Sequence, residues 1–346
     1  MIQVASTLLP SLLDHARVDL RKNVTPIEYL PNFSESLGIK VFAKRDDTLS
    51  LGMGGNKVRQ LEYYLGPAMA QGADTILITG AVQSNFVCLC AAACARLGLK
   101  SVVQLEERVP NDDNSYKHSG NVLLNKVLGA EIHYFHQGED EAAADANLDK
   151  LADKLRSQGR KPYVIHLGID HSPIGGLGYA ECAVECFLQL QMLNQLPDHV
   201  VVPTGSGLTH AGFLAGARAI GWKVSVHGIC VRRAAELQRI RIRQRTHEIL
   251  ALLQSSEGCQ EQDILVDDSV LAPGYGQLNK AVLEAIRLGA RSEGMLLDPV
   301  YSGRTVAGLI SLTRGGAIKA GQSVLFLHTG GLPALFAYQS ALSELL

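Results

Sequence analysis

The sequence has few aromatic residues and almost no excess of charge. Of its 346 residues, phenylalanine, tryptophan and tyrosine together make up 5%, and the formal net charge at pH 7 is -2. Proteins that bind nucleic acids or anionic membranes carry a positive field that attracts these partners. The lack of such a field excludes both as expected partners and leaves a small molecule.

The sequence also lacks a long hydrophobic run. No apolar stretch approaches the roughly 20 residues that a membrane-spanning helix needs. Asp14, His15, Arg17 and Asp19 interrupt the apolar residues of the first 20 positions, so a secretion-signal core is missing there. These absences predict a cytoplasmic protein without a membrane segment.

The seven cysteines are not spaced like a disulfide framework. Cys90 and Cys94 could share a helix face, but no histidine lies within a few residues of them to complete a metal cluster. The sequence therefore predicts no metal site. It predicts buried, reduced thiols, as in a reducing compartment.

What the chain does have is a regular alternation of short apolar runs with helical patterns. Strands are expected at 41–44, 75–79, 101–105, 131–135, 163–166, 199–202, 224–231 and 324–328, with the strand at 199–202 ending before Pro203. Such alternation predicts parallel sheets covered by helices on both faces. We expect two α/β lobes, with a ligand cleft at the carboxyl ends of the strands.

A lysine follows one of these strands in the stretch Gly54-Gly55-Asn56-Lys57. The two glycines permit φ > 0 and let another backbone approach closely. Lys57 can form an imine with a carbonyl compound if its amine is desolvated and held nearby. The alternative is a solvated lysine at the start of a helix.

Three further loops follow expected strands and open helices with small or hydroxyl residues. In the loop at 83–85, Ser84 or Asn85 could cap the next helix, which would not exclude a ligand contact. Free amides and the helix dipole after the loop at 204–209 favour a phosphate, although one such loop is a weak signal. The loop at 328–331 repeats the arrangement.

Another long helix is expected at 232–253, and it carries a dense run of arginines. These are Arg239, Arg241, Arg243 and Arg245. We interpret this run as a solvated face rather than an anion-binding site.

Together, a lysine amine, a phosphate cradle and several hydroxyls meet the needs of pyridoxal 5'-phosphate (PLP). Five motifs occur in order: GGNK at 54–57, QSN at 83–85, APGYG at 272–276, LDPVY at 297–301 and HTGG at 328–331. This combination resembles the D-cysteine desulfhydrase and 1-aminocyclopropane-1-carboxylate (ACC) deaminase family of PLP-dependent enzymes. The resemblance extends over residues 25–338.

The resemblance implies the fold of tryptophan synthase β-like PLP enzymes (fold type II). This fold has two three-layer α/β lobes with mostly parallel sheets. The large PLP-binding domain would comprise residues 1–57 and 169–346, and the small domain residues 58–168. The resemblance also implies a homodimer.

The resemblance further assigns roles to individual residues. Lys57 would hold PLP covalently, Asn85 would bind the ring hydroxyl, and Ser84 would face the substrate. The phosphate would lie in the loop formed by Gly205, Ser206, Gly207, Leu208 and Thr209. Tyr275 and Tyr301 match the two tyrosines on the substrate side, where tyrosine suits either proton transfer or orientation of a carboxylate.

Departures from the family's pattern help to choose a branch. ACC deaminases have a glutamate near the pyridine nitrogen, where this chain has Ser302, and an apolar residue where it has Thr329. Both hydroxyls match the desulfhydrase branch. Gln60 replaces a basic residue, and the stretch from Phe86 to Cys90 is also altered. Phe86 either reshapes the floor of the pocket or is only helix packing.

The sequence thus predicts a PLP-dependent lyase. It would catalyse α,β-elimination from a small β-substituted amino acid, as a D-cysteine desulfhydrase does, and give pyruvate, ammonia and the leaving group. The alternatives are ACC deamination or β-replacement on the same fold, and a PLP-binding protein without turnover. A carrier would need only Lys57 and the phosphate loop, so the retention of Ser84, Tyr275 and Tyr301 argues against it.

Overall fold

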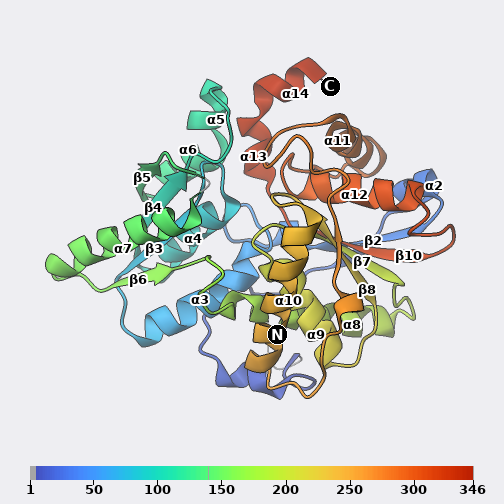
Figure 1. Cartoon of the computed structure of the whole chain (residues 1–346), viewed down its shortest axis with the longest axis horizontal. Coiled ribbons are helices and arrows are strands. Elements are labelled where there is room, and N and C mark those ends of the chain that lie inside the picture. The colour runs from blue at the N-terminus through green and yellow to red at the C-terminus, as the bar shows by residue number, and fades with distance from the viewer. Residues whose placement is uncertain (1–4, 139, 346) are drawn as a thin grey trace.

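Two β-sheets flanked by helices make up the structure (Figure 1), a computed structural model that describes residues 5–138 and 140–345. The larger sheet has six strands in the order β1-β2-β10-β7-β8-β9, and the smaller has four in the order β5-β4-β3-β6. Neighbouring strands are parallel except β1 and β2, which are antiparallel. The predicted α/β fold with mostly parallel sheets is confirmed.

The strands of the two sheets come from different parts of the chain. The larger sheet contains β1 (Ile27–Tyr29), β2 (Lys40–Arg45), β7 (His199–Thr204), β8 (Ser225–Cys230), β9 (Leu265–Asp267) and β10 (Ser323–His328). The smaller sheet contains β3 (Thr75–Ala81), β4 (Lys100–Glu106), β5 (Glu131–Phe135) and β6 (Pro162–Ile165). All four strands of the smaller sheet fall within 58–168, while the exact domain boundaries stay a prediction.

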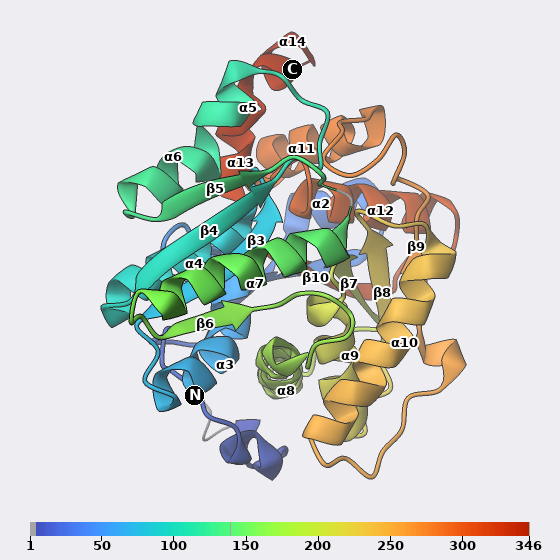
Figure 2. The same ribbon diagram turned by 60° about the vertical axis from the view of Figure 1, so that its left-hand side comes forward.

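The α-helices follow the same division. Those from the middle of the chain are α3 (Lys57–Ala70), α4 (Asn85–Leu97), α5 (Asn114–His118), α6 (Gly120–Val127) and α7 (Glu141–Ser157). The others are α2 (Pro31–Leu37), α8 (Leu177–Met192), α9 (Leu208–Ala219), α10 (Ala235–Leu252), α11 (Lys280–Glu293), α12 (Ser302–Arg314), α13 (Leu332–Ala337) and α14 (Gln339–Leu345). Figure 2 shows α7 lying across the smaller sheet and α10 beside the ends of β7 and β8.

Both faces of the smaller sheet are covered, which explains its continuous apolar strands. Successive side chains of a strand point to opposite faces. On β3, Leu77 packs with Leu148 of α7, whereas Ile76 and Ile78 join the core that contains Val87 of α4. The larger sheet is buried in the same way, between α11 and α12 on one face and α8 and α9 on the other.

The strand expected to stop before Pro203 in fact continues to Thr204. Proline cannot donate a backbone hydrogen bond, so it is tolerated in a strand only where no partner needs that donor. The pairing of β7 with β10 ends at Val201, two residues before Pro203. The short elements β1, β9, α2 and α5 were not expected from the sequence either.

The predictions about membrane segments and about cysteines can be compared with the described part of the chain. None of the helices in residues 5–138 and 140–345 is both long and apolar enough to cross a membrane. All seven cysteines are buried and free, as predicted.

The parallel sheets bring four loops of the sequence analysis to the carboxyl ends of β2, β3, β7 and β10. Strands β2 and β10 run side by side, with Val324 opposite Val41 and His328 opposite Arg45. The loops that contain Lys57 and Thr329 therefore begin at the same edge. Open α/β sheets bind ligands at this edge.

Candidate active site

A cleft lies at these strand ends, and elements of both sheets line it. Of the predicted site residues, all but Leu208 and Ser302 are in the lining. Those present are Lys57, Ser84, Asn85, Gly205, Ser206, Gly207, Thr209, Tyr275, Tyr301 and Thr329. The fold thus brings together residues that are up to 272 positions apart (329 − 57).

The lysine loop is fixed by a close approach of two backbones. Gly55 has a φ of 121°, and a Cβ atom there would lie 2.7 Å from the carbonyl oxygen of Thr329. The amide of Asn56 donates to that same oxygen at 3.2 Å. Glycine is therefore required at position 55, and its contact places Lys57 next to Thr329 at the head of α3.

The amine of Lys57 has no carboxylate partner among the described residues. Its Nζ lies 3.4 Å from Oε1 of Gln60 and 4.9 Å from the centre of the Phe86 ring. Burial lowers the pKa of this amine to about 8, because removing water disfavours the charged form. An amine in this state is partly neutral near pH 7 and suited to attack a carbonyl.

The loop after β7 has the form of an anion cradle. Gly207 has a φ of 96° and precedes α9, whose first amides have no acceptor within the helix. The hydroxyl of Thr209 accepts hydrogen bonds from Asn56 at 2.8 Å and Gln60 at 3.0 Å. Its own proton is left to donate into the cleft. Leu208 is buried and contributes no lining side chain.

Ser84 and Asn85 combine a structural role with exposure to the cleft. The hydroxyl of Ser84 accepts the amide hydrogen of Val87 at 3.3 Å and caps α4, as the sequence analysis allowed. Asn121 donates to Oδ1 of Asn85 at 2.7 Å. This bond occupies the oxygen of the Asn85 amide and leaves its NH₂ group to donate to a ligand.

Phe86 lines the cleft, whereas Cys88 and Cys90 do not. In the altered stretch from Phe86 to Cys90, Phe86 therefore contributes to the pocket and the two cysteines do not. Phe86 forms part of the pocket wall beside Lys57, and the two cysteines pack inside the helical layer.

Tyr275 and Tyr301 form a hydrogen-bonded pair. Their hydroxyl oxygens are 2.8 Å apart, and their rings meet edge to face. Burial raises the pKa of both phenols above the ordinary value. Each tyrosine therefore keeps its proton near neutral pH and can transfer it or donate a hydrogen bond.

Ser302 and Thr329 differ in the structure. Ser302 is fully buried, and its hydroxyl donates to Asp298 at 2.7 Å while it accepts the amide of Asp298 at 2.8 Å. Its side chain is thus used within the loop and is not part of the lining. The hydroxyl of Thr329 is buried at the cleft with no hydrogen-bond partner in the described chain.

Thr329 provides a direct test of whether a polar ligand fits. A buried hydroxyl without a partner costs about 1–3 kcal/mol, and a ligand acceptor or donor would remove this cost. Together with the free donor of Thr209 and the Lys57 amine of lowered pKa, it fits a ligand with a carbonyl, a polar ring and a phosphate. PLP has these three features.

The sequence analysis missed a set of charged residues that line the cleft. They are Glu106, Arg108, Glu141, Asp145, Arg232 and Arg241. Arg108 binds Glu106 through two hydrogen bonds of 2.8 and 2.7 Å. No local motif marks these residues, because they come from one strand (β4), two helices (α7 and α10) and two loops that only the fold brings together.

The interpretation of the arginine run as one solvated face is wrong. Arg243 is exposed and pairs with Glu261, but Arg241 and Arg245 are buried. Residues four apart lie on the same side of a helix, whereas residues two apart do not. Arg241 and Arg245 therefore face the protein interior, where Arg241 lines the cleft, while Arg243 faces the solvent, and the spacing could have shown this division.

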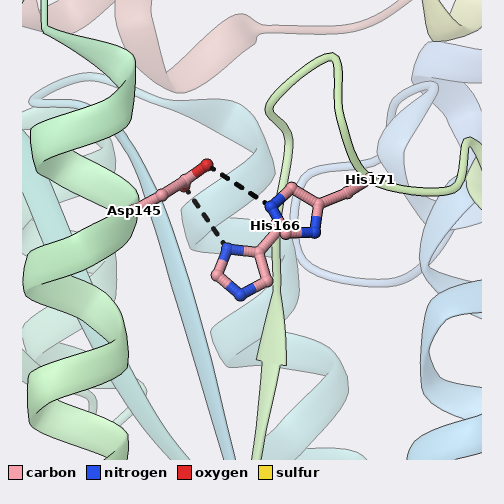
Figure 3. A group of neighbouring side chains, drawn as sticks. All are labelled: Asp145, His166 and His171. Carbon is pink, nitrogen blue, oxygen red and sulfur yellow. Dashed lines mark ion pairs between the residues drawn. The ribbon is translucent and has the colours of Figure 1, made fainter.

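Asp145, which lines the cleft, lies close to His166 and His171 and points from α7 toward both rings (Figure 3). The two rings stack with centres 4.0 Å apart and planes 9° apart. Because a metal binds a ring nitrogen in the plane of its ring, nearly parallel rings do not converge on one ion. Contacts of His166 with Asp145 at 3.5 Å and Asp149 at 3.2 Å instead raise the pKa of His166.

Comparison with known proteins agrees with this geometry. Residues 18–330 match the model of the family described as "Pyridoxal-phosphate dependent enzyme". The chain belongs to this family. It is therefore a PLP-dependent enzyme, and the predicted cofactor is confirmed.

Two D-cysteine desulfhydrases are among its curated relatives. The one from Klebsiella pneumoniae subsp. pneumoniae is 40% identical over 332 residues, which cover 95% of this chain and 98% of the relative. The one from Salmonella typhi is 40% identical over 326 residues, covering 93% and 96%. The predicted membership of the desulfhydrase and ACC deaminase family is thereby confirmed.

Solved structures confirm the predicted fold. A crystal structure of an ACC deaminase homologue has a TM-score of 0.86 and 34% identity, and the match covers 98% of this chain and 99% of that one. An O-ureido-L-serine synthase has a TM-score of 0.64 at 19% identity, covering 95% and 94%. At that identity the second likeness shows the fold alone.

Proposed function

We propose that this PLP-dependent enzyme is a lyase that removes the β-substituent of a small D-amino acid, as a D-cysteine desulfhydrase does. The observation that carries the proposal is the Lys57 amine. It is desolvated, has no carboxylate partner in the described chain and opens into the same cleft as Ser84 and the tyrosine pair. A PLP carrier without turnover would not need these additional groups.

Each residue has a proposed task in the reaction. Bound PLP withdraws electrons from the substrate's α-carbon. Lys57 holds the cofactor and then, as a free amine with a pKa of about 8, removes the α-proton. The bond between Cβ and the leaving group breaks, and the leaving group departs with its electron pair. Water converts the released enamine into pyruvate and ammonia.

The surrounding side chains would orient the substrate and the cofactor. Asn85 donates its NH₂ group to the ring hydroxyl of PLP, and Ser84 contacts the substrate. Tyr275 and Tyr301 share one hydrogen bond between their hydroxyl groups. The pair can give a proton to the leaving group or bind a carboxylate of the substrate. The loop from Gly205 to Thr209 binds the phosphate.

Elimination is favoured over ACC deamination by the groups on the Thr329 side of the cleft. Thr329 is uncharged, and Ser302 is bound to Asp298. Both oxygens of Asp298 accept hydrogen bonds from the loop itself, including the amides of Tyr301 and Ser302. The Asp298 carboxylate is thus not free to accept a hydrogen bond from a protonated ring nitrogen and keep it protonated, so the bound cofactor would be a weaker electron sink.

Product analysis tests this function. We expect pyruvate from β-chloro-D-alanine, which carries a good leaving group, and slower pyruvate formation from D-cysteine. The L-enantiomers serve as controls for configuration. Rapid 2-oxobutyrate formation from ACC without pyruvate from any β-substituted alanine would overturn the proposal, and PLP binding without any product would favour a carrier.

We further propose that the enzyme acts in the cytoplasm as a homodimer. Seven buried free thiols suit a reducing compartment, and the resemblance to the family supports the dimer. Sedimentation velocity of the holoenzyme would measure the oligomeric state.

A further inference from the structure

Helix α10 packs beside the loop that is proposed to bind the phosphate. Two side chains of the helix and one from the residue Arg233 just before it donate hydrogen bonds to that loop. Gln238 donates to the carbonyl oxygen of Gly205 at 3.1 Å and to the hydroxyl of Thr204 at 2.8 Å. Arg233, just before the helix, donates to the same carbonyl at 3.1 Å. Arg241 donates through Nε to the carbonyl oxygen of Ser206 at 2.8 Å.

These contacts determine where the loop's amides point. In a trans peptide the N–H bond is directed opposite to the C=O bond of the same unit. Because the carbonyls of Gly205 and Ser206 turn toward α10, the amides of Ser206 and Gly207 turn away from it. Both residues line the cleft, so these two donors are available to an anion there.

The charges around α10 also suit an anion. Four arginines and two glutamates lie beside the loop among the described residues: Arg108, Arg232, Arg233, Arg241, Glu106 and Glu141. Glu141 faces three of these arginines, and Glu106 pairs with Arg108, so arginines outnumber carboxylates in the described part of the group. Asp145, the other acidic residue of the lining, faces His166 and His171 instead.

A phosphate monoester carries about 1.5–2 negative charges at neutral pH, so it is attracted to a group in which arginines predominate. From the start of α3, the neutral amides of Asn56 and Gln60 donate to Thr209 at 2.8 and 3.0 Å. Neither amide brings a positive charge to the loop, whereas Arg241 does. Arg241 both lines the cleft and donates a hydrogen bond to the loop.

We propose that Arg241 is a cofactor-positioning residue, which turns the loop's amides into the cleft and neutralises the phosphate of PLP. Gln238 supports the same orientation without charge. Arg241 also donates to the carbonyl of Leu167 at 3.1 Å, so it links the phosphate loop to the segment that follows β6. This inference rests on the proposed phosphate site and is independent of the reaction catalysed.

The test compares two ligands that differ only in the phosphate. Apoenzyme is titrated with PLP and with pyridoxal, and the dissociation constants are measured from visible absorbance. Arg241→Gln should weaken PLP binding by about tenfold or more, as expected for losing a bond to a charged group, and should leave pyridoxal binding unchanged. Arg243→Gln, two positions along on the exposed side of α10, is the matched control and should change neither constant.

Two further variants separate charge from loop shape. Arg241→Lys should recover part of the lost PLP affinity because it restores the charge, and Gln238→Leu should weaken PLP but not pyridoxal. Equal losses for PLP and pyridoxal in Arg241→Gln, or no loss for either, would overturn the proposal. Absence of elimination activity in the wild-type enzyme would contradict the proposed function without affecting this result.

Discussion

Lys57 and Arg59 are two cations in the first turn of α3, and their surroundings are opposite. Arg59 is fully buried and donates to both oxygens of Asp46 at 2.8 Å and to Glu185 at 2.9 Å. Burial disfavours its charge, but the two carboxylates outweigh this effect and raise the pKa of Arg59. Lys57 is desolvated without such partners, and its pKa falls to about 8.

The pairing around Arg59 extends into a larger buried network. Glu62 binds Arg21 at 2.6 Å, and Glu185 also binds Lys44 at 2.5 Å. Asp46, which holds Arg59, accepts the amide of Gly55 through its backbone oxygen at 2.9 Å. The paired cations thus form a rigid support for the lysine loop, and the unpaired cation is the reactive one.

The largest effect is expected from removing the unpaired cation. Lys57→Ala should abolish turnover and the visible absorbance of the bound cofactor, because no other described amine is placed to make the covalent link. Absorbance spectra and pyruvate assays would measure both. Stability should change little, since the amine has no ion pair to lose. A variant that keeps both the band and the activity would contradict the assignment.

Removing the paired cation should have the reverse effect. Arg59→Ala leaves Asp46 and Glu185 buried with fewer partners, which typically costs about 3–5 kcal/mol of unfolding free energy. Denaturant unfolding of the holoenzyme would measure the loss. Arg314→Ala, which breaks an exposed pair with Glu284, is the control and should cost less than about 1 kcal/mol. Similar costs for the two variants would show that the network is not a support.

The pH dependence of cofactor capture should reveal the desolvated amine. Only the neutral amine attacks a carbonyl, so capture should speed up as pH rises and should level off above about 8, the pKa of Lys57. An ordinary lysine would give a midpoint near 10.5. Stopped-flow mixing of apoenzyme with PLP would measure the profile, with Lys57→Ala as the blank. A midpoint near the ordinary value would show that the amine is solvated.

A smaller effect is expected at the phosphate loop. Thr209→Ala removes a hydroxyl whose proton is free to donate to the phosphate, so PLP binding should weaken by about 1.5–3 kcal/mol. Titration of the apoenzyme gives the dissociation constant. Thr313→Ala removes a hydroxyl that donates within α12 and should leave binding unchanged. Equal affinity in Thr209→Ala and wild type would place the phosphate elsewhere.

Local sequence predicted the parts of the site that loops build. Lys57, Ser84, Asn85, Gly205 and Thr329 each lie between the end of a strand and the first residue of the next helix, that residue included, and glycine or hydroxyl residues mark these junctions. Parallel pairing then brings such junctions to one edge, so their assembly follows from the fold class.

What the sequence did not predict depends on contacts between distant elements. Glu106 and Arg108 follow an apolar strand, and Glu141 belongs to a helix that looks solvated in sequence; the fold turns all three to the cleft. Ser302 was expected beside the cofactor ring, but Asp298, four residues earlier, takes its hydroxyl. A hydroxyl that a motif assigns to a ligand can instead form its hydrogen bond with a neighbouring residue of the same loop, and the motif alone does not show which bond forms.

The identity of the reactive cation can be tested directly by borohydride reduction of the holoenzyme followed by peptide mapping. Reduction makes the link between cofactor and protein permanent, so the modified peptide identifies the lysine. We expect the adduct on Lys57, the desolvated amine without a carboxylate partner in the described chain. Recovery of the adduct on Lys44, whose amine is paired with Glu185, or on any other lysine would contradict the account.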